Sequence, residues 1–125
     1  MPAKRIAAGK QNLKALRDFV TALSEGDSQA ADSALGRIKL KDTDFGKGYR
    51  KALSGMKISI DDGNVDSLMH KCLNGHLTKE RRNELRREFS DRRKTPFAPK
   101  AERGYFAAWK DVLRLVDSIQ KSKSG

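Results

Sequence analysis

Apolar residues recur at three- and four-residue steps along most of the chain, which is the spacing of an amphipathic α-helix. The pattern predicts six helices and no β-strand. The first helix is expected over residues 3–24, and the second begins after Asp27, a residue type that caps helix N-termini. The apolar stripes of these helices are Ile6, Leu13, Leu16, Val20 and Leu23, followed by Ala31, Ala34, Leu35 and Ile38.

The middle of the chain repeats this pattern. Asp42 or Thr43 can cap a third helix, which ends at the turn formed by residues 61–64. A fourth helix is expected from Val65 to a glycine cap at Gly75. These two helices would bury Phe45, Tyr49, Ala52, Leu53 and Met56, and then Leu68, Met69, Cys72 and Leu73.

Two helices are expected in the last part of the chain, on either side of a proline-containing connector. Thr78 starts the fifth helix, which runs to about residue 94. Two prolines in residues 95–99 remove backbone donors and exclude helix from the connector. The sixth helix begins near Lys100 and frays over residues 122–125, with an inward stripe of Tyr105, Trp109, Val112, Val116 and Ile119.

The chain is therefore expected to form an all-α fold, a compact bundle of about six helices in a single basic domain over residues 1–125. A Gly-Tyr-x-x-Ala-apolar pattern occurs twice, at residues 48–53 and 104–109. Its small residues would let another helix approach closely. Two interpretations remain open: a duplicated three-helix unit with sub-units 1–60 and 64–122, or a coincidence of helix packing.

Composition narrows the class of protein. The 125 residues contain 27 Lys and Arg against 16 Asp and Glu, a formal net charge of +11. Cys72 is the single cysteine, which excludes an intrachain disulfide and favours a reducing cytoplasm. No apolar run approaches the ~20 residues that a bilayer span needs, nor does the N-terminal sequence resemble a signal peptide. The excess positive charge indicates a polyanionic partner.

Charge segregation is strongest in the predicted fifth helix. Residues 79–94 carry eight basic and four acidic side chains, and at about 100° per residue the two signs occupy separate stripes. A row of arginines can grip phosphate groups through paired donors, although the same side chains could instead bridge to acids on neighbouring helices. The predicted nucleic-acid-binding residues here are Lys79, Arg82, Arg86 and Arg93, with Arg81 and Arg92 on the other flank of the apolar positions.

A second group of cations lies on the predicted first helix, where Lys10, Lys14 and Arg17 flank the apolar stripe. The net charge is +4 over residues 1–24 and +6 over residues 67–100, with −1 in the segment between them. If the first and fifth helices pack side by side, their basic flanks would merge into one nucleic-acid-binding surface.

Other candidate chemistry has little support. His70, Cys72 and His76 lack the four-ligand spacing of a zinc site, and no phosphate loop or nucleophile–base arrangement occurs. We therefore expect no enzymatic activity, no cofactor and no metal. Phe97 in the connector is interpreted as a plug over the core, with a stacking platform for an unpaired base as the alternative. Core positions are also expected for Tyr105, Phe106 and Trp109.

Two glycine- and aromatic-rich segments carry a resemblance to other proteins. They read Phe45-Gly46-x-Gly48-Tyr49-x-x-Ala52-Leu53-x-Gly55 and Arg103-Gly104-Tyr105-Phe106-x-Ala108-Trp109. This combination resembles a family of small uncharacterised archaeal helical proteins. The resemblance covers about a fifth of the chain, and it implies an archaeal source without implying an activity.

Two functional hypotheses follow from the charge pattern. The first is a non-enzymatic, cytoplasmic nucleic-acid-binding protein that contacts phosphates through its arginine-rich helix. RNA, including ribosomal RNA, is favoured over DNA because no DNA-reading motif occurs and arginine-rich helices suit folded RNA. The alternative is a helical protein–protein interaction adaptor with an acidic partner. A lipid surface is disfavoured, because residues 79–94 offer only two large apolar side chains for insertion.

Overall fold

A computed structural model describes residues 9–64, 67–73, 77–94 and 99–124. Within these ranges all regular structure is helical, which confirms the predicted all-α bundle. The elements are a short 3-10 helix η1 (Lys10–Asn12) and the α-helices α1 (Leu13–Glu25), α2 (Ser28–Arg37), α3 (Asp44–Asp61), α4 (Leu68–Leu73), α5 (Lys79–Lys94) and α6 (Lys100–Ser124).

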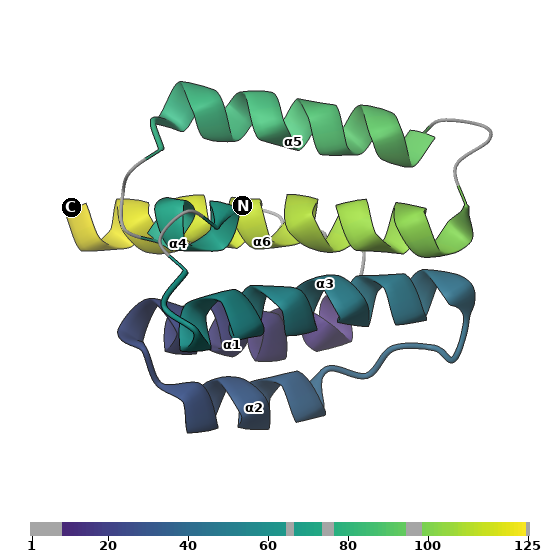
Figure 1. The fold of residues 1–125 in the computed structure, drawn as a ribbon, viewed down its shortest axis with the longest axis horizontal. Helices are drawn as coiled ribbons and strands as arrows, with labels where there is room; N and C mark the ends of the chain where they lie inside the picture. The colour runs from purple at the N-terminus through teal and green to yellow at the C-terminus, as the bar shows by residue number, and fades with distance from the viewer. Residues whose placement is uncertain (1–8, 65–66, 74–76, 95–98, 125) are drawn as a thin grey trace.

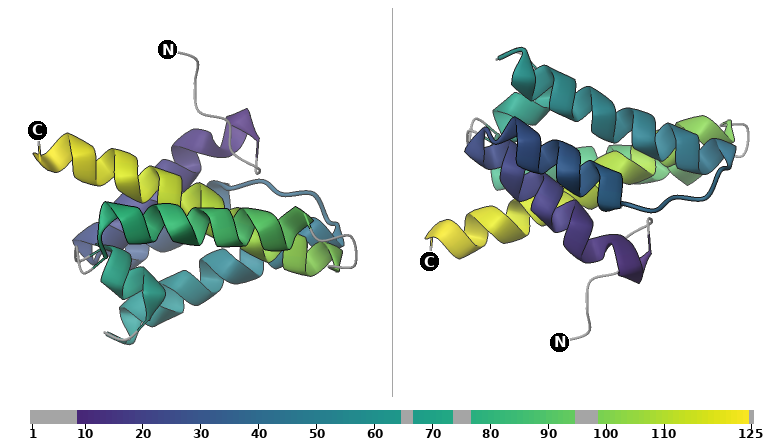
Figure 2. Two further views of the ribbon diagram at one scale, coloured as in Figure 1. Left: turned by 90° about the horizontal axis from the view of Figure 1, so that it is seen from above. Right: turned by 90° about the horizontal axis from the view of Figure 1, so that it is seen from below.

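Helix α6 lies at the centre of the bundle. Figure 1 shows α5 along one side of α6 and α3 along the other, with α2 as the outermost helix beyond α3 and α1. Helix α1 packs on α2 and crosses beneath α6 (Figure 2). Residues 106–109 of α6 are all buried, and four consecutive positions cover every side of a helix. This burial results from the packing of α5 and α3 on opposite sides of α6.

Side-chain caps set three helix starts where the sequence predicts them. Asp27 accepts a hydrogen bond from the Ala30 amide at 3.0 Å, and Thr43 accepts one from the Gly46 amide at 3.1 Å. Thr78 accepts one from the Arg81 amide at 3.1 Å and so starts α5. Each oxygen satisfies an amide of the first turn that has no partner within the helix.

The structure corrects three helical details. Gly9 has a φ of 97° and is followed by the 3-10 turn η1, so α1 begins at Leu13 instead of near residue 3. Helix α6 continues to Ser124, beyond the predicted start of fraying. Tyr105 is 37% exposed, whereas Phe106 is buried, because α6 packs against helices on more than one side. The predictions for Ile6, Val65, Gly75 and Phe97 fall outside the described residues.

Two glycines bring the backbones of α3 and α6 into direct contact. A β-carbon placed on Gly48 would lie 1.8 Å from the carbonyl oxygen of Ala101, and one placed on Gly104 would lie 1.9 Å from that of Phe45. The contact is reciprocal, since each glycine meets the carbonyl three residues before the other glycine. The repeated Gly-Tyr-x-x-Ala pattern therefore has a packing role at this crossing.

The same helix pair encloses a polar contact. The Tyr49 hydroxyl donates a 2.7 Å hydrogen bond to a carboxylate oxygen of Asp111, and both residues are buried. Burial, followed by the neighbouring Asp111 charge, raises the pKa of Tyr49 above its ordinary value.

The pairings of helices differ between the two halves of the chain, because α2 packs on α1 whereas α5 packs on α6. The duplication of a three-helix unit, with sub-units 1–60 and 64–122, remains a prediction.

Replacing Gly48 or Gly104 by alanine should destabilise the protein by about 2–3 kcal/mol, since the new methyl group meets a backbone carbonyl that cannot move aside. Gly55→Ala is the matched control in α3, because a β-carbon there meets nothing within 4 Å. The control should be stabilising by roughly 0.5–1 kcal/mol through its helix propensity. Urea unfolding of the three variants measures both effects, and equal stabilities for Gly48→Ala and Gly55→Ala would contradict the close crossing.

Candidate nucleic-acid interface

Helix α5 is held on α6 by a small apolar contact. Leu85 is buried against the core. The ring of Phe89 stacks on Phe106 at 5.6 Å between centroids and tilts against Trp109 at 6.0 Å. Residues 82, 85, 86 and 89 follow the helical period, so the face that carries Leu85 and Phe89 also directs two arginines toward α6.

Those two arginines share one carboxylate. Arg82 Nε donates a hydrogen bond to Oδ1 of Asp117 on α6, and Arg86 lies 3.4 Å from Oδ2 of the same residue. Arg82 also donates to the Leu77 carbonyl at 2.9 Å, and Arg86 donates to Asn83 Oδ1. Of the predicted basic row, Arg82 and Arg86 are therefore engaged within the molecule. Arg82 in particular joins α5 to α6 and is poorly exposed.

Of the two residues predicted on the other flank of α5, Arg81 meets acids of its own helix. Arg81 lies 3.1 Å from a carboxylate oxygen of Glu84 and 3.8 Å from one of Glu88. The arginine side chain is long enough to reach the acidic stripe that the helical period places beside it. These contacts are exposed and contribute little to stability. Arg92 and Arg93 belong to the last turn of α5, and their side chains lie outside the described part of the chain.

The remaining predicted cations are exposed. Lys79 on α5 and Lys10, Lys14 and Arg17 at the start of the chain form no ion pair with the other described residues. The two basic flanks do not merge by direct packing, because α6 lies between α5 and α1 (Figure 1). An extended basic surface would therefore have to include residues of α6.

Helix α6 supplies such residues at an open groove that it forms with α5. The groove has a volume of about 490 Å³. It is lined by Asn83, Arg86, Arg87 and Ser90 of α5 and by Lys110 and Arg114 of α6. Four of these side chains are cationic and none is a carboxylate, so the described lining residues of the groove are positively charged or neutral polar.

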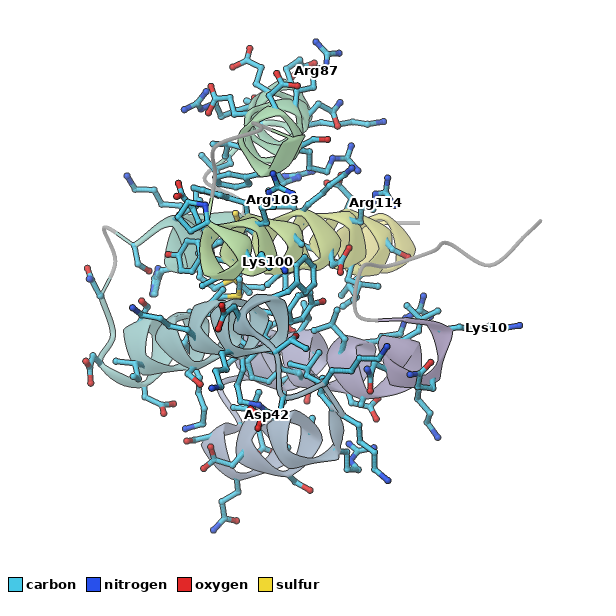
Figure 3. All side chains as sticks on the ribbon, turned by 90° about the vertical axis from the view of Figure 1, so that its right-hand side faces the viewer. Lys10, Asp42, Arg87, Lys100, Arg103 and Arg114 are labelled. Atoms are coloured by element: carbon cyan, nitrogen blue, oxygen red, sulfur yellow. The ribbon has the colours of Figure 1, made fainter. Side chains whose placement is uncertain are left out.

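The cationic side chains of the groove differ in position and in their contacts. In Figure 3, Arg114 lies on the side of α6 that faces α5, and it extends toward the side of the molecule that carries Lys10. Arg87 projects from the outer side of α5 and is exposed (Figure 3). Lys110 Nζ donates a 3.3 Å hydrogen bond to Ser90 Oγ across the groove. A phosphodiester chain following the groove would meet donors from both helices.

Sequence reasoning missed Arg87, Lys110 and Arg114. Lys110 and Arg114 are four residues apart and therefore lie on one face of α6, a signal that the sequence contains. The spacing of Lys110 and Arg114 indicates a binding surface only once α5 is known to pack beside this face of α6. Arg87 lies between the two charge stripes of its helix, and only the position of the groove distinguishes it from other exposed arginines.

The groups considered for metal binding do not form a ligand cluster in the described residues. Cys72 is fully buried, and His76 lies outside the described ranges. Burial raises the pKa of the Cys72 thiol to about 11. None of the helices in the described part of the chain combines the length and apolar character that crossing a bilayer requires.

The buried thiol should make stability depend on pH. Its pKa is higher in the folded protein than in the unfolded chain, so its stabilising contribution is complete below about pH 9 and is lost as the pH rises toward 11. The stability difference between the wild type and Cys72→Ala should shrink by about 2–3 kcal/mol from pH 8 to pH 11. Urea unfolding at several pH values measures this, and a constant difference would contradict the burial of the thiol.

No family model, curated protein or solved structure matches the chain. A functional conclusion must therefore come from the chemistry of the groove and of the exposed cations around it.

Proposed function

We propose that the protein binds nucleic acid without catalysing a reaction, and that it contacts phosphate groups along the groove between α5 and α6. RNA is the favoured ligand, and association with ribosomal RNA is one form of this function. The observation that carries the proposal is a groove lined by Arg86, Arg87, Lys110 and Arg114 with no carboxylate among its lining residues.

The charge arrangement supports a ligand with many negative groups. A formal net charge of +11 attracts any polyanion, and the groove brings four cationic side chains together in one place. The exposed Lys10 of η1 lies toward the same side of the molecule as Arg114 (Figure 3), and the exposed Lys14 and Arg17 follow it on α1. A ligand longer than the groove could reach these cations as well.

RNA is favoured over DNA because of the way these donors are presented. They lie on a compact bundle in which the described aromatic rings of the α5–α6 contact point inward. None of the helices in the described ranges carries a DNA-reading motif, whereas arginine-rich surfaces suit the phosphates of folded RNA. Contacts of this kind depend on shape and charge more than on sequence.

The test replaces groove cations that do not hold Asp117. The triple variant Arg87→Gln, Lys110→Gln, Arg114→Gln should lose about 100-fold in affinity for a short RNA duplex at 0.1 M salt, because up to three phosphate contacts disappear. The slope of log affinity against log salt should become shallower by about two. Fluorescence anisotropy of a labelled duplex at several salt concentrations measures both quantities.

A matched control removes the same charge elsewhere. Lys39→Gln, Lys41→Gln, Lys51→Gln alters three exposed lysines on α3 and the segment before it. The affinity of this control for the RNA duplex should fall by less than about fivefold, because the three substitutions change only the long-range attraction. Equal losses of affinity in the two triple variants would contradict the proposal, because the groove cations would then act only through the net charge of the protein.

The choice among ligands needs separate measurements. RNA and DNA duplexes of equal length and sequence should differ in affinity in favour of RNA, and the protein should sediment with ribosomes at low salt. The absorbance ratio at 260 and 280 nm of the purified native protein should fall after nuclease treatment. Failure to bind either nucleic acid at low salt would remove this proposal and leave an acidic protein as the partner of the basic surface.

A further inference from the structure

We propose that Asp117 sets the affinity of the α5–α6 groove, because its carboxylate competes with a phosphate group of the ligand for Arg86. The inference deepens the proposed function and rests on it for the identity of the natural ligand. The chemistry required of the ligand is a phosphate oxyanion, which an RNA backbone or free inorganic phosphate can supply.

The position of Arg86 is the first argument. Its guanidinium is shared, since the residue lines the groove and also lies 3.4 Å from Oδ2 of Asp117. Arg82, by contrast, does not line the groove and binds the other carboxylate oxygen of Asp117 as well as the Leu77 carbonyl. Arg82 thus contributes to the contact between α5 and α6, whereas Arg86 lies between Asp117 and the groove.

Exposure supports the same division. The side chain of Arg82 is 11% exposed and that of Asp117 is 18% exposed, whereas that of Arg86 is 27% exposed. Arg86 is also the more distant of the two ionic partners of Asp117. When a phosphate enters the groove, Arg86 can turn toward it while Arg82 still neutralises Asp117. Asp117, which is partly buried, therefore keeps a cationic partner throughout the exchange, and a partly buried carboxylate without one would be costly.

The packing of α5 explains why this exchange need not release the helix. Leu85 and Phe89 continue to contact the core and the rings of α6, and Arg82 keeps its bond to Asp117. Ligand binding therefore changes the partner of one guanidinium and leaves the bundle assembled. In the free protein, the same carboxylate reduces the positive potential of the groove at Arg86 and weakens binding of any phosphate.

Asp117→Asn tests this competition with little change of shape. The amide oxygen can still accept the hydrogen bond from Arg82, while the charge that holds Arg86 disappears. Affinity for the RNA duplex should rise by about five- to tenfold at 0.1 M salt, which corresponds to about one more neutralised phosphate. Adding Arg86→Gln to this variant should abolish the gain.

Asp18→Asn is the matched control. It also converts an aspartate to asparagine and releases an arginine, because Asp18 lies 3.2 Å from Arg37 on the α1–α2 side of the bundle. Its affinity should rise by less than about twofold. Equal gains from Asp117→Asn and Asp18→Asn, or a gain that persists with Arg86→Gln, would overturn the inference and leave only an effect of net charge.

Trp109 reports whether α5 stays in place, since it is the single tryptophan and its ring faces Phe89. Its emission maximum should be the same in the wild type and in Asp117→Asn. A red shift would mean that the contact between α5 and α6 is lost in the variant. The competition for Arg86 is then tested in the wild-type protein.

In the wild type, the carboxyl carbon-13 resonance of Asp117 should move on addition of inorganic phosphate, and that of Asp18 should not. No movement at Asp117, while phosphate or RNA does bind, would overturn the inference and leave the proposed function intact. Movement with phosphate in a protein that binds no RNA would support the exchange and refute the nucleic-acid function. A protein in which phosphate moves neither resonance and RNA does not bind would refute both.

Discussion

The arrangement of the bundle depends on the direct backbone contact between α3 and α6. Gly48 and Gly104 leave no space for a β-carbon at this crossing, and the adjacent Tyr49 carries a buried hydrogen bond to Asp111. Such a contact sets the distance and orientation of the two helices more narrowly than apolar side chains alone, since side chains can change rotamer and a backbone carbonyl cannot. With α6 fixed against α3, its opposite side is available to α5.

Helix α5 combines a small apolar contact with a large charge. Leu85 and Phe89 are its main core-facing side chains, and the ion pairs of Arg82 and Arg86 with Asp117 add a polar contact at the same interface. The arginines that the helical period places in one row therefore divide into two groups. Arg82 has a structural role, and the groove between the helices is left to Arg86 and to cations contributed by both α5 and α6.

Local features were predictable because they depend on residues close together in the chain. The caps at Asp27, Thr43 and Thr78 each lie three residues before the amide that they bind. The error at the first helix also has a local cause, the positive φ of Gly9, which apolar periodicity does not report. Phe106 and Trp109 are buried as predicted, whereas Tyr105 is 37% exposed, because the helices that pack on α6 decide which of its positions are covered.

The sequence by itself determined the six helices, the excess of positive charge and its concentration in residues 79–94, since spacing and composition are properties of the chain alone. Only the tertiary structure decided which cations meet a carboxylate of another helix and which line a groove. Asp117 reaches Arg82 across 35 residues, and Lys110 meets Ser90 across 20, because α5 packs on α6. Partners so far apart in sequence are brought together by packing, and no local pattern records that choice.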